Sequence, residues 1–318
     1  MVRVASLSEF PRALKNVPVF LCVGNFDGVH RGHRALFELA EEQAKQRGGV
    51  VGALTFSPHP EAFFRGADAA KLIYSPATKL EIFEKLGLDF AVTQTFFAEF
   101  SKIPAEDFLP LLKKSIPALT GVFVGENFRF GASRKGNVAV LRESAVSENV
   151  AVNALPPVLF ENEKISSTRI RERLRAGEMN AVNVMLAEPY FSAGKIVSGR
   201  RLGRTIGFPT LNLPWEPETR PRFGVYAVRL RFKRKTFPAV ANYGVRPTVE
   251  RGEVPAPLLE TFLLNNPDSS EIPGYGDTVV VEWLEFLRPE QRFDSVETLR
   301  KCLREDCARA EAFWTGAR

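Results

Sequence analysis

The chain has 318 residues, of which 45% are hydrophobic and 25% charged, and its formal net charge is +6. This composition predicts a globular protein with a full core, and the length favours two domains over one. No apolar run reaches the roughly 18 residues of a membrane-spanning helix, and the first residues lack the apolar segment of a signal peptide. Three cysteines without disulfide or zinc-ribbon spacing indicate a reducing compartment. We therefore expect a cytoplasmic protein that does not bind a membrane.

The positive charge allows a polyanionic partner, which could be nucleic acid or a phosphate-rich small molecule. Basic residues are spread along the chain, with local clusters at 199–204 and 229–235. They lack the aromatic interleaving that is typical of a groove for single-stranded nucleic acid. Charge alone does not choose between these partners.

The first half of the chain alternates short apolar runs with helical patterns. The apolar run 17–24 predicts a buried strand, 32–47 an amphipathic helix that ends at Gly48, and 50–56 the next strand. The alternation continues with helices expected over 77–87, 104–114 and 137–149 and strands over 89–96, 121–126 and 150–156. The sequence thus predicts a Rossmann-like α/β domain, in which helices cover both faces of a parallel sheet. Ligands of such sheets bind beyond the carboxyl ends of the strands.

The stretch GNFDGVHRGH, which starts at residue 24, leaves the first predicted strand and opens the first predicted helix. Gly24, Gly28 and Gly32 allow sharp turns and a close approach of the backbone to a ligand. A helix start offers unpaired N–H groups and the positive end of the helix dipole. This combination predicts an anion site in which His30 and His33 donate to phosphate oxygens.

Two alternatives to a phosphate site remain open for this stretch. His30, His33, His59 and Asp27 could make a zinc site, although no cysteine completes a recognised spacing. The stretch could also be a turn that carries two surface histidines, which would leave the clustering of all three histidines before residue 60 unexplained.

A second motif, ISSTRIRERL, starts at residue 165. Ser166, Ser167 and Thr168 stand where a helix N-cap is expected, with Arg169 and Arg171 just inside the helix. Hydroxyl and guanidinium groups at a helix start are good ligands for the triphosphate tail of a nucleotide. A well-capped helix with a solvated basic face is an equally good interpretation of this segment alone.

After two short helices predicted within 167–190, the pattern changes to strands separated by Gly- and Pro-rich turns. Strands are expected over 191–199, 224–232, 236–244, 258–264 and 277–288, followed by a closing helix over 294–314 that Asp294 or Ser295 can cap. In 224–232 apolar and basic residues alternate, which is typical of a half-buried antiparallel strand. We expect an antiparallel β-barrel, closed or nearly closed, and domains at 1–186 and 187–318.

The stretch GRRLGRTIGFPTLNL, from residue 199, predicts a second site. It forms a flexible basic loop suited to polyphosphate, which includes Gly199, Arg200, Gly203, Gly207 and Pro209. Thr210 and Asn212 follow two positions apart on a strand and therefore face the same side, which suits magnesium held jointly with ATP phosphates. A basic surface loop that runs into an edge strand explains the same residues equally well.

Glu260 lies inside an apolar predicted strand. A carboxylate in such a place is either paired or functional, because burying an unpaired charge is costly.

These motifs together resemble a known family. H-x-G-H after a first strand, with a later S-S-T-x-I-R, resembles the nucleotidyltransferase superfamily. With TFSPHP and VGENFRFG, the first half is similar to the FMN adenylyltransferase part of bacterial bifunctional FAD synthetases. G-x-x-x-G-F-P-T-x-N, followed by GVYAV, NYGVRPTV and LETFLL, resembles riboflavin kinase. The resemblance covers the chain from about residue 17 to residue 310.

For the first domain, the resemblance implies adenylyl transfer from ATP to FMN, giving FAD and pyrophosphate. His30 and His33 would steady the charge on the triphosphate, and Ser167, Thr168 and Arg169 would surround the leaving pyrophosphate. The implied ATP-binding set also includes Gly24, Asn25, Phe26, Asp27, Gly28, Gly32 and Ser166, and the implied flavin-binding set is His59, Asn127 and Arg129. Positioning and electrostatics would carry the catalysis, because the FMN phosphate is already a competent nucleophile.

For the second domain, the resemblance implies phosphorylation of riboflavin to FMN. Thr210 and Asn212 would coordinate Mg²⁺ with ATP, and Glu260 would be the base that faces the ribityl 5′-hydroxyl. The chain departs from the family pattern at Asn127, where aspartate is more frequent, and at Phe262 and Asn265.

The resemblance therefore predicts a bifunctional enzyme, a monomer or weak homo-oligomer, whose partners are ATP, riboflavin and FMN and not nucleic acid. The alternatives are an enzyme that retains one of the two activities and a regulator that binds flavin or nucleotide.

Overall fold

The computed structural model describes residues 1–14, 16–199, 202–245, 256–265, 267–268 and 271–315. The chain forms two compact units, Met1–Thr168 and Arg169–Arg318. This division falls at the start of the first of the two short helices, whereas the predicted division falls after them, at residue 186.

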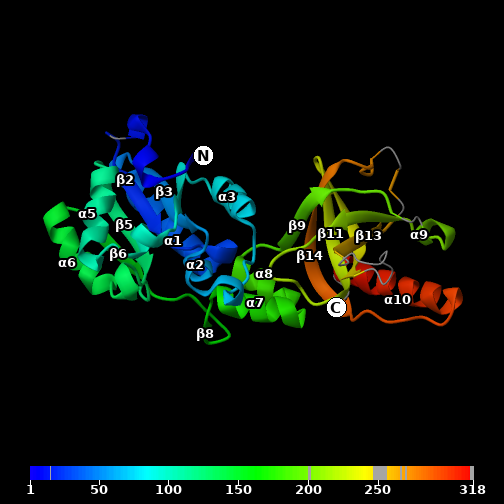
Figure 1. The fold of residues 1–318 in the computed structure, drawn as a ribbon. Coiled ribbons are helices and arrows are strands. Elements are labelled where there is room, and N and C mark those ends of the chain that lie inside the picture. Colours follow the sequence, from blue (N-terminus) through cyan, green and yellow to red (C-terminus); the bar gives the residue numbers. More distant parts are fainter. Residues whose placement is uncertain (15, 200–201, 246–255, 266, 269–270, 316–318) are drawn as a thin grey trace. The chain divides into compact units, whose positions relative to one another are not determined.

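The first unit is built on a six-stranded sheet in the order β1-β4-β3-β2-β5-β6 (Figure 1). Its strands are β1 (Val2–Val4), β2 (Val19–Val23), β3 (Val50–Ser57), β4 (Phe90–Thr95), β5 (Leu119–Gly125) and β6 (Ala151–Leu155). All neighbouring strands run parallel. Every residue of the central strand β2 is buried, which explains its uninterrupted apolar sequence. The predicted parallel sheet is confirmed.

Helices cover both faces of this sheet, with α1 and α3 on one side and α5 and α6 on the other (Figure 1). The helices are α1 (Arg31–Arg47), α2 (Pro60–Arg65), α3 (Pro76–Lys85), α4 (Ala98–Ser101), α5 (Ala105–Ser115) and α6 (Val138–Glu148), and a hairpin of β7 (Leu159–Phe160) and β8 (Glu163–Lys164) follows β6. Short 3-10 turns lie at η1 (Leu7–Glu9), η2 (Arg12–Leu14), η3 (Asp27–Val29), η4 (Gly66–Asp68) and η5 (Ala132–Arg134). As predicted, α1 ends at Gly48, which takes a left-handed φ of 60°.

The strand order places the candidate phosphate loop at a topological switch point. After β2 the chain adds β3 and β4 toward one edge of the sheet. It later adds β5 and β6 toward the opposite edge. The carboxyl ends of β2 and β5 are therefore neighbours from which the chain leaves in opposite directions. Crevices of this kind are where open α/β sheets bind ligands.

The second unit contains a six-stranded antiparallel sheet in the order β10-β13-β12-β11-β14-β9. Its strands are β9 (Tyr190–Lys195), β10 (Thr210–Pro214), β11 (Gly224–Phe232), β12 (Lys235–Val245), β13 (Pro257–Leu263) and β14 (Thr278–Arg288). An isolated bridge between Val197 and Asn212 connects the chain after β9 to the opposite edge strand β10. The sheet thus curls into the nearly closed barrel that the sequence predicts.

Four helices accompany this sheet: α7 (Ser167–Ala176), α8 (Met179–Leu186), α9 (Leu202–Thr205) and α10 (Val296–Thr315). The helices α7 and α8 are the two short helices predicted within 167–190. The predicted closing helix is α10, and the Ser295 hydroxyl accepts a hydrogen bond of 3.1 Å from the backbone N–H of Thr298. Ser295 therefore caps this helix.

The predicted alternation of buried and exposed residues in β11 is correct only for the second half of the strand. Val225 and Ala227, which the pattern would expose, are buried in a cluster with Ala310 of α10, because that helix covers the outer face of the sheet there. Farther along, Arg229 and Arg231 both pair with the buried Glu282 of β14.

Candidate active sites

The first candidate site begins where β2 ends, at the carboxyl edge of the parallel sheet. The chain turns through η3, and Phe26 and Gly28 take left-handed φ values of 53° and 79°. A side chain at Gly24 would come within 3.1 Å of the Phe26 ring, so this position favours glycine. The turn brings His30 to the N-cap of α1.

The two predicted phosphate-binding histidines lie against each other. The rings of His30 and His33 are stacked, with centroids 3.6 Å apart and planes 15° apart. Both Nδ1 atoms are buried, and neither has a hydrogen-bond partner among the described residues. Burial lowers the pKa of His30 to about 4, and burial, His30 and Lys79 together lower the pKa of His33 well below its ordinary value. Both imidazoles are therefore neutral near pH 7, and each offers one N–H donor rather than a full charge.

The histidines line a pocket of about 220 Å³ at the switch point. Its walls come from the ends of β2 and β5, the start of α1 and the chain after β6: Val23, Gly24, Phe26, His30, Gly32, His33, Leu36, Gly125, Glu126, Asn127, Phe128, Leu155, Pro156, Pro157, Val158 and Ile165. The structure thus brings together six of the residues predicted for this site, from two motifs about 100 residues apart: Gly24, Phe26, His30, Gly32, His33 and Asn127.

The second predicted motif meets the first through Ser167. Its hydroxyl donates a hydrogen bond of 2.9 Å to the carbonyl of Asp27, 140 residues earlier. The Asp27 carboxylate accepts a separate hydrogen bond of 2.9 Å from the backbone N–H of Ile73. Asp27 therefore braces the loop by its side chain.

Other members of that motif lie at the start of α7. Thr168 is exposed and Ser166 half-buried, while Arg169 is buried. The prediction that these residues stand at a helix start is correct. We expected their hydroxyls to cap the helix, but the Ser167 hydroxyl donates to the Asp27 carbonyl.

The three residues predicted to bind flavin lie in different environments. His59 caps α2, and its Nδ1 accepts from the backbone N–H of Glu61 at 3.2 Å. Asn127 lines the pocket beside the histidines. Arg129 is exposed and is not part of that lining.

Sequence reasoning missed Thr55 and Lys79, which support the phosphate loop from behind. The Lys79 ammonium donates to the Asn25 carbonyl at 3.0 Å and to the Thr55 hydroxyl at 2.8 Å. That hydroxyl also donates to the Asn25 carbonyl, at 3.0 Å. A lysine near the start of an amphipathic helix carries no signal of such a role, because this position usually faces solvent.

A cluster of aromatic side chains comes from the end of β3, from α2, from the chain after β4 and from α4. Neighbouring ring centroids are 5.1–6.5 Å apart, and the members are Phe56, Phe63, Phe64, Phe96, Phe97 and Phe100. Phe64 is 63% exposed and Phe97 41%. Exposed rings grouped in this way are typical of a binding surface for a flat apolar group.

In the second unit, strand register brings the predicted kinase residues together. Glu260 of β13 stands opposite Asn212 of β10 on one side and opposite Asn242 of β12 on the other. Residues paired in register point to the same face of a sheet, so a carboxylate is flanked by two carboxamides. Glu260 is half-buried, on the less buried face of its strand. Asn242 is a member of this group that sequence reasoning did not single out, although it opens the quoted motif NYGVRPTV.

The glycine-rich loop leads into this group. A side chain at Gly199 would collide with the Asn212 carboxamide, and one at Gly203 would collide with the Phe208 carbonyl. Gly207 has a φ of 86°. Arg200, which we predicted to bind phosphate, lies outside the described residues. Pro209 directly precedes Thr210, the first residue of β10.

One departure from the family pattern has a structural role. The ring of Phe262 lies 5.1 Å from that of Phe208, so this residue packs the loop against β13. Asn265 follows the strand with a left-handed φ of 63°, a conformation that asparagine tolerates well.

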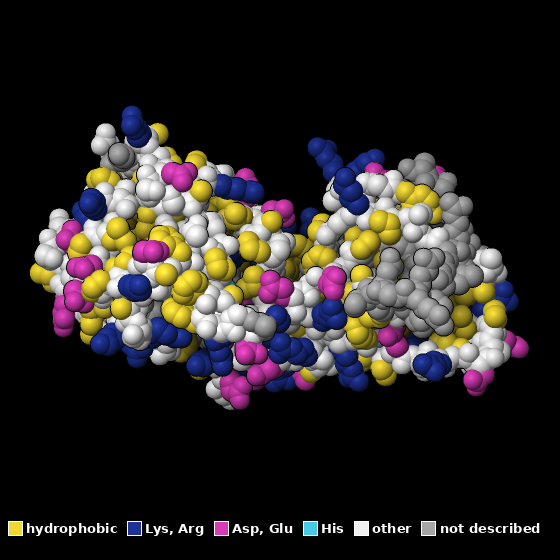
Figure 2. All heavy atoms as spheres, in the orientation of Figure 1, with side chains coloured by type: hydrophobic (Ala, Val, Ile, Leu, Met, Phe, Trp, Pro, Cys, Tyr) yellow, Lys and Arg dark blue, Asp and Glu magenta, His cyan; other side chains and the backbone are white. Residues whose placement is uncertain are grey.

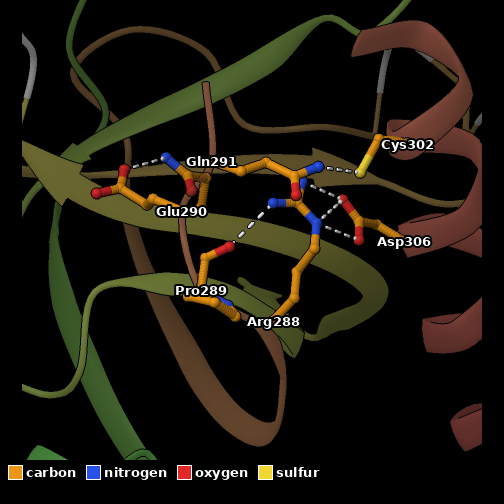
Figure 3. A network of polar contacts seen from close by, with 7 residues as sticks. Arg288, Pro289, Glu290, Gln291, Cys302 and Asp306 are labelled. Atoms are coloured by element: carbon orange, nitrogen blue, oxygen red, sulfur yellow. Dashed lines mark hydrogen bonds and ion pairs between the residues drawn. The ribbon is translucent and has the colours of Figure 1, made fainter. Parts of the chain in front are cut away.

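A second carboxylate approaches the same strand face from the segment between β14 and α10. Glu290 accepts a hydrogen bond from the Asn242 carboxamide at 3.3 Å. Figure 3 shows that Glu290 points away from Arg288, whose guanidinium binds both oxygens of Asp306 at 2.7–3.2 Å. In the same view Gln291 donates to Cys302, so this segment is anchored to α10 on one side and to Asn242 on the other.

Among the described residues no group of three or more His, Cys, Asp or Glu could hold a metal ion. The alternative zinc site of His30, His33, His59 and Asp27 is therefore not formed there. Within the same residues, no helix has the length and apolar character needed to cross a membrane. Lys and Arg are interspersed with Asp and Glu on the face drawn in Figure 2.

Known proteins match both halves of the chain. A family model described as FAD synthetase matches residues 14–169, and one described as riboflavin kinase matches residues 186–314. The bifunctional riboflavin kinase/FMN adenylyltransferase of Escherichia coli (strain K12) is 32% identical over 297 residues, which cover 92% of each chain. The protein of the same name from Haemophilus influenzae is 32% identical and covers 92% of this chain and 94% of its own.

A solved structure from Streptococcus pneumoniae, named a macrolide-efflux protein, resembles the chain with a TM-score of 0.84 and 27% identity over 96% of both chains. The two family models match the two halves in the order in which the motifs occur, and the similarity extends over nearly the whole length. The chain therefore belongs to the family of bifunctional riboflavin kinase/FMN adenylyltransferases, with the FAD synthetase part first and the riboflavin kinase part second.

Proposed function

We propose that the first unit joins ATP and FMN in the pocket beside His30 and His33, and that the second phosphorylates riboflavin at Glu260. The observation that carries the first assignment is the stacked histidine pair, whose Nδ1 atoms are buried without a partner among the described residues, in a pocket at the switch point. The second assignment rests on the alignment of Asn212, Glu260 and Asn242 on neighbouring strands.

In adenylyl transfer, an oxygen of the FMN phosphate attacks the α-phosphorus of ATP, and the bond to pyrophosphate breaks. No protein group needs to become covalently modified. The neutral imidazoles of His30 and His33 donate N–H groups to phosphate oxygens, and the start of α1 adds the positive end of its dipole. Ser167, Thr168 and Arg169 are the proposed contacts of the leaving pyrophosphate.

The aromatic cluster on α2 and the chain after β4 is the proposed place of the flavin ring system. Phe63 and Phe64 are exposed and lie close to His59 in sequence, and a flat isoalloxazine can stack on such rings. His59, Asn127 and Arg129 remain proposed flavin contacts.

In the kinase reaction, Glu260 accepts the proton of the ribityl 5′-hydroxyl while the γ-phosphoryl group of ATP transfers to that oxygen. The loop that contains Gly199, Gly203 and Gly207 is the proposed phosphate cradle, together with Arg200 and Pro209.

Mg²⁺ fits the residues present, because Thr210 and Asn212 supply hard oxygen donors, and the lack of a side chain at Gly199 lets the loop approach the Asn212 carboxamide closely. When bound with ATP, the ion neutralises charge on the phosphates.

We further propose that the protein is cytoplasmic, that it acts as a monomer or weak homo-oligomer on small molecules and not on nucleic acid, and that its domains divide near residue 186. The three cysteines are free thiols, which supports the proposed reducing compartment.

The test is to incubate the purified full-length protein with riboflavin, ATP and Mg²⁺ and to follow the flavins by chromatography. FMN should appear first and FAD second, and supplied FMN should yield FAD directly. Omission of Mg²⁺ should stop both steps. Formation of FMN without FAD would favour the alternative of one retained activity, and flavin binding without turnover would favour a regulator.

A further inference from the structure

A half-buried lysine lies directly behind the phosphate loop. Lys79 is on α3, one turn before the buried Ile82 and Phe83. Its ammonium reaches the Asn25 carbonyl at 3.0 Å and the Thr55 hydroxyl at 2.8 Å. Thr55 itself is fully buried in β3.

A charge in this place is costly unless something compensates it. Burial removes an ammonium from water, and the two groups that accept its hydrogen bonds, the Asn25 carbonyl and the Thr55 hydroxyl, are neutral. A methionine or leucine would pack against the same α3 neighbours without that cost. The cost is consistent with a functional reason for the charge.

The neighbouring groups show what the charge can serve. Asp27 is the titratable group of opposite sign that faces Lys79, from η3, and His33 faces it from α1. Because His30 and His33 are neutral, the positive charge that contacts the loop comes from Lys79 at the Asn25 carbonyl and from Arg34, whose guanidinium donates to the Val29 carbonyl at 3.1 Å.

We propose that Lys79 is a positioning residue for adenylyl transfer, which holds the Asn25 carbonyl from behind and adds positive charge beside the two neutral histidines. Lys79 is not among the described residues that line the pocket, so it acts through the loop and through its field. Low-dielectric surroundings strengthen that field at the triphosphate. The inference rests on the proposed adenylyl-transfer site.

A dependence on pH follows. Burial lowers the pKa of Lys79 to about 8, against the opposing effect of Asp27. Below pH 8 the ammonium keeps its charge, and above pH 8 the neutral amine still donates hydrogen bonds but attracts phosphate less. The kcat/KM for ATP, which reports groups of the free enzyme, should therefore fall as the pH rises through about 8.

The experiment compares the full-length wild type with Lys79→Gln, which keeps a hydrogen-bond donor without the charge, and with Lys79→Arg, which keeps the charge. Lys85→Gln, at an exposed position of the same helix, is the matched control. FAD formation from FMN, ATP and Mg²⁺ is measured from pH 6.5 to 9.5, and FMN formation from riboflavin by the same chain reports integrity of the second unit.

We expect Lys79→Gln to lower kcat/KM for ATP about 100-fold, chiefly through KM, and to abolish the fall above pH 8. Lys79→Arg should recover at least a tenth of the wild-type value, and Lys85→Gln should match the wild type. Lys79→Gln within about threefold of wild type, or slower with the alkaline fall unchanged, would overturn the inference.

If Lys79→Gln lacks the thermal unfolding transition of the first unit, the variant cannot be compared, and the pH dependence of kcat/KM in the wild type becomes the test. A wild-type kcat/KM for ATP that stays constant above pH 8 overturns the inference. A wild type that makes FMN but no FAD would contradict the proposed adenylyl-transfer site itself. Failure of that site can therefore be distinguished from failure of the role of Lys79.

Discussion

At the scale of single residues, the two proposed sites contain different polar and charged groups. The proposed adenylyl-transfer site has His30 and His33 as neutral donors, with the Lys79 ammonium behind their loop. The proposed kinase site has a carboxylate, Glu260, between two carboxamides. All three histidines of the chain lie before residue 60, so a base drawn from the second unit's side chains cannot be an imidazole.

Replacement of His33 by alanine tests the first site. We expect His33→Ala to reduce FAD formation from FMN at least about 100-fold, because the site loses a preorganised donor to the triphosphate. FMN formation from riboflavin should be unchanged, since the kinase residues lie in the other unit. Both activities are measured chromatographically on the same preparation, and loss of both would contradict the assignment of one site to each unit.

Removal of the carboxylate tests the second site. Glu260→Gln keeps the shape of the side chain but cannot accept the hydroxyl proton, so riboflavin phosphorylation should fall about 100-fold or more. Supplied FMN should still be converted to FAD at the wild-type rate. A Glu260→Gln protein that phosphorylates riboflavin normally would show that another group is the base.

At the scale of elements, sequence patterns located most helices and strands because each has a clear period or cap. The buried strand β2, the glycine-ended α1 and the Ser295-capped α10 are examples. The short α2 and the two-residue strands β7 and β8 were not predicted, since segments of this length contain too few residues to show a period.

The helix α10 illustrates how one ion pair anchors an element. Asp306 is almost fully buried, and it holds the Arg288 guanidinium through three contacts of 2.7–3.2 Å between nitrogen and oxygen atoms. This pair joins the end of β14 to the helix, and Glu290 leaves the same segment toward Asn242.

Breaking this pair should destabilise the second unit. Asp306→Ala leaves a mostly buried guanidinium without its partner, so we expect the free energy of unfolding to fall by about 3 kcal/mol. Urea titration followed by tryptophan fluorescence measures this, with the exposed Asp294→Ala as control. Adding Arg288→Met to Asp306→Ala should recover part of the loss, and equal stability of Asp306→Ala and the wild type would refute the anchoring role.

At the scale of the whole molecule, the chain divides into two compact units. The helix α8 belongs to the second: Asn183 donates to the Trp283 carbonyl at 2.8 Å and accepts from the Tyr190 N–H at 2.8 Å. Met185 and Leu186 of the same helix are fully or almost fully buried. Contacts thus join α8 to the barrel, although the helix lies on the N-terminal side of the proposed boundary at residue 186.

Fragments can test where the kinase domain begins. A fragment from residue 169 should phosphorylate riboflavin and unfold at a higher temperature than one from residue 187, because the shorter one loses the α8 packing and the Asn183 hydrogen bonds. Circular dichroism gives the transitions and an FMN assay gives the activity. A folded fragment from residue 169 that is inert would argue against an independent kinase unit.

The sequence by itself determined the two-part architecture, the family and the candidate residues of each site, because glycines at turns, caps and periodic apolar runs act locally and leave a readable pattern. Only the tertiary structure decided which of these residues meet. Ser167 reaches the loop at Asp27, Glu260 stands between Asn212 and Asn242, and Lys79 arrives behind Asn25. Such contacts depend on strand register and helix packing between segments far apart in the chain, and no local pattern encodes them. The neutral state of the histidines has the same origin, since burial sets their pKa values and burial is a property of the folded chain.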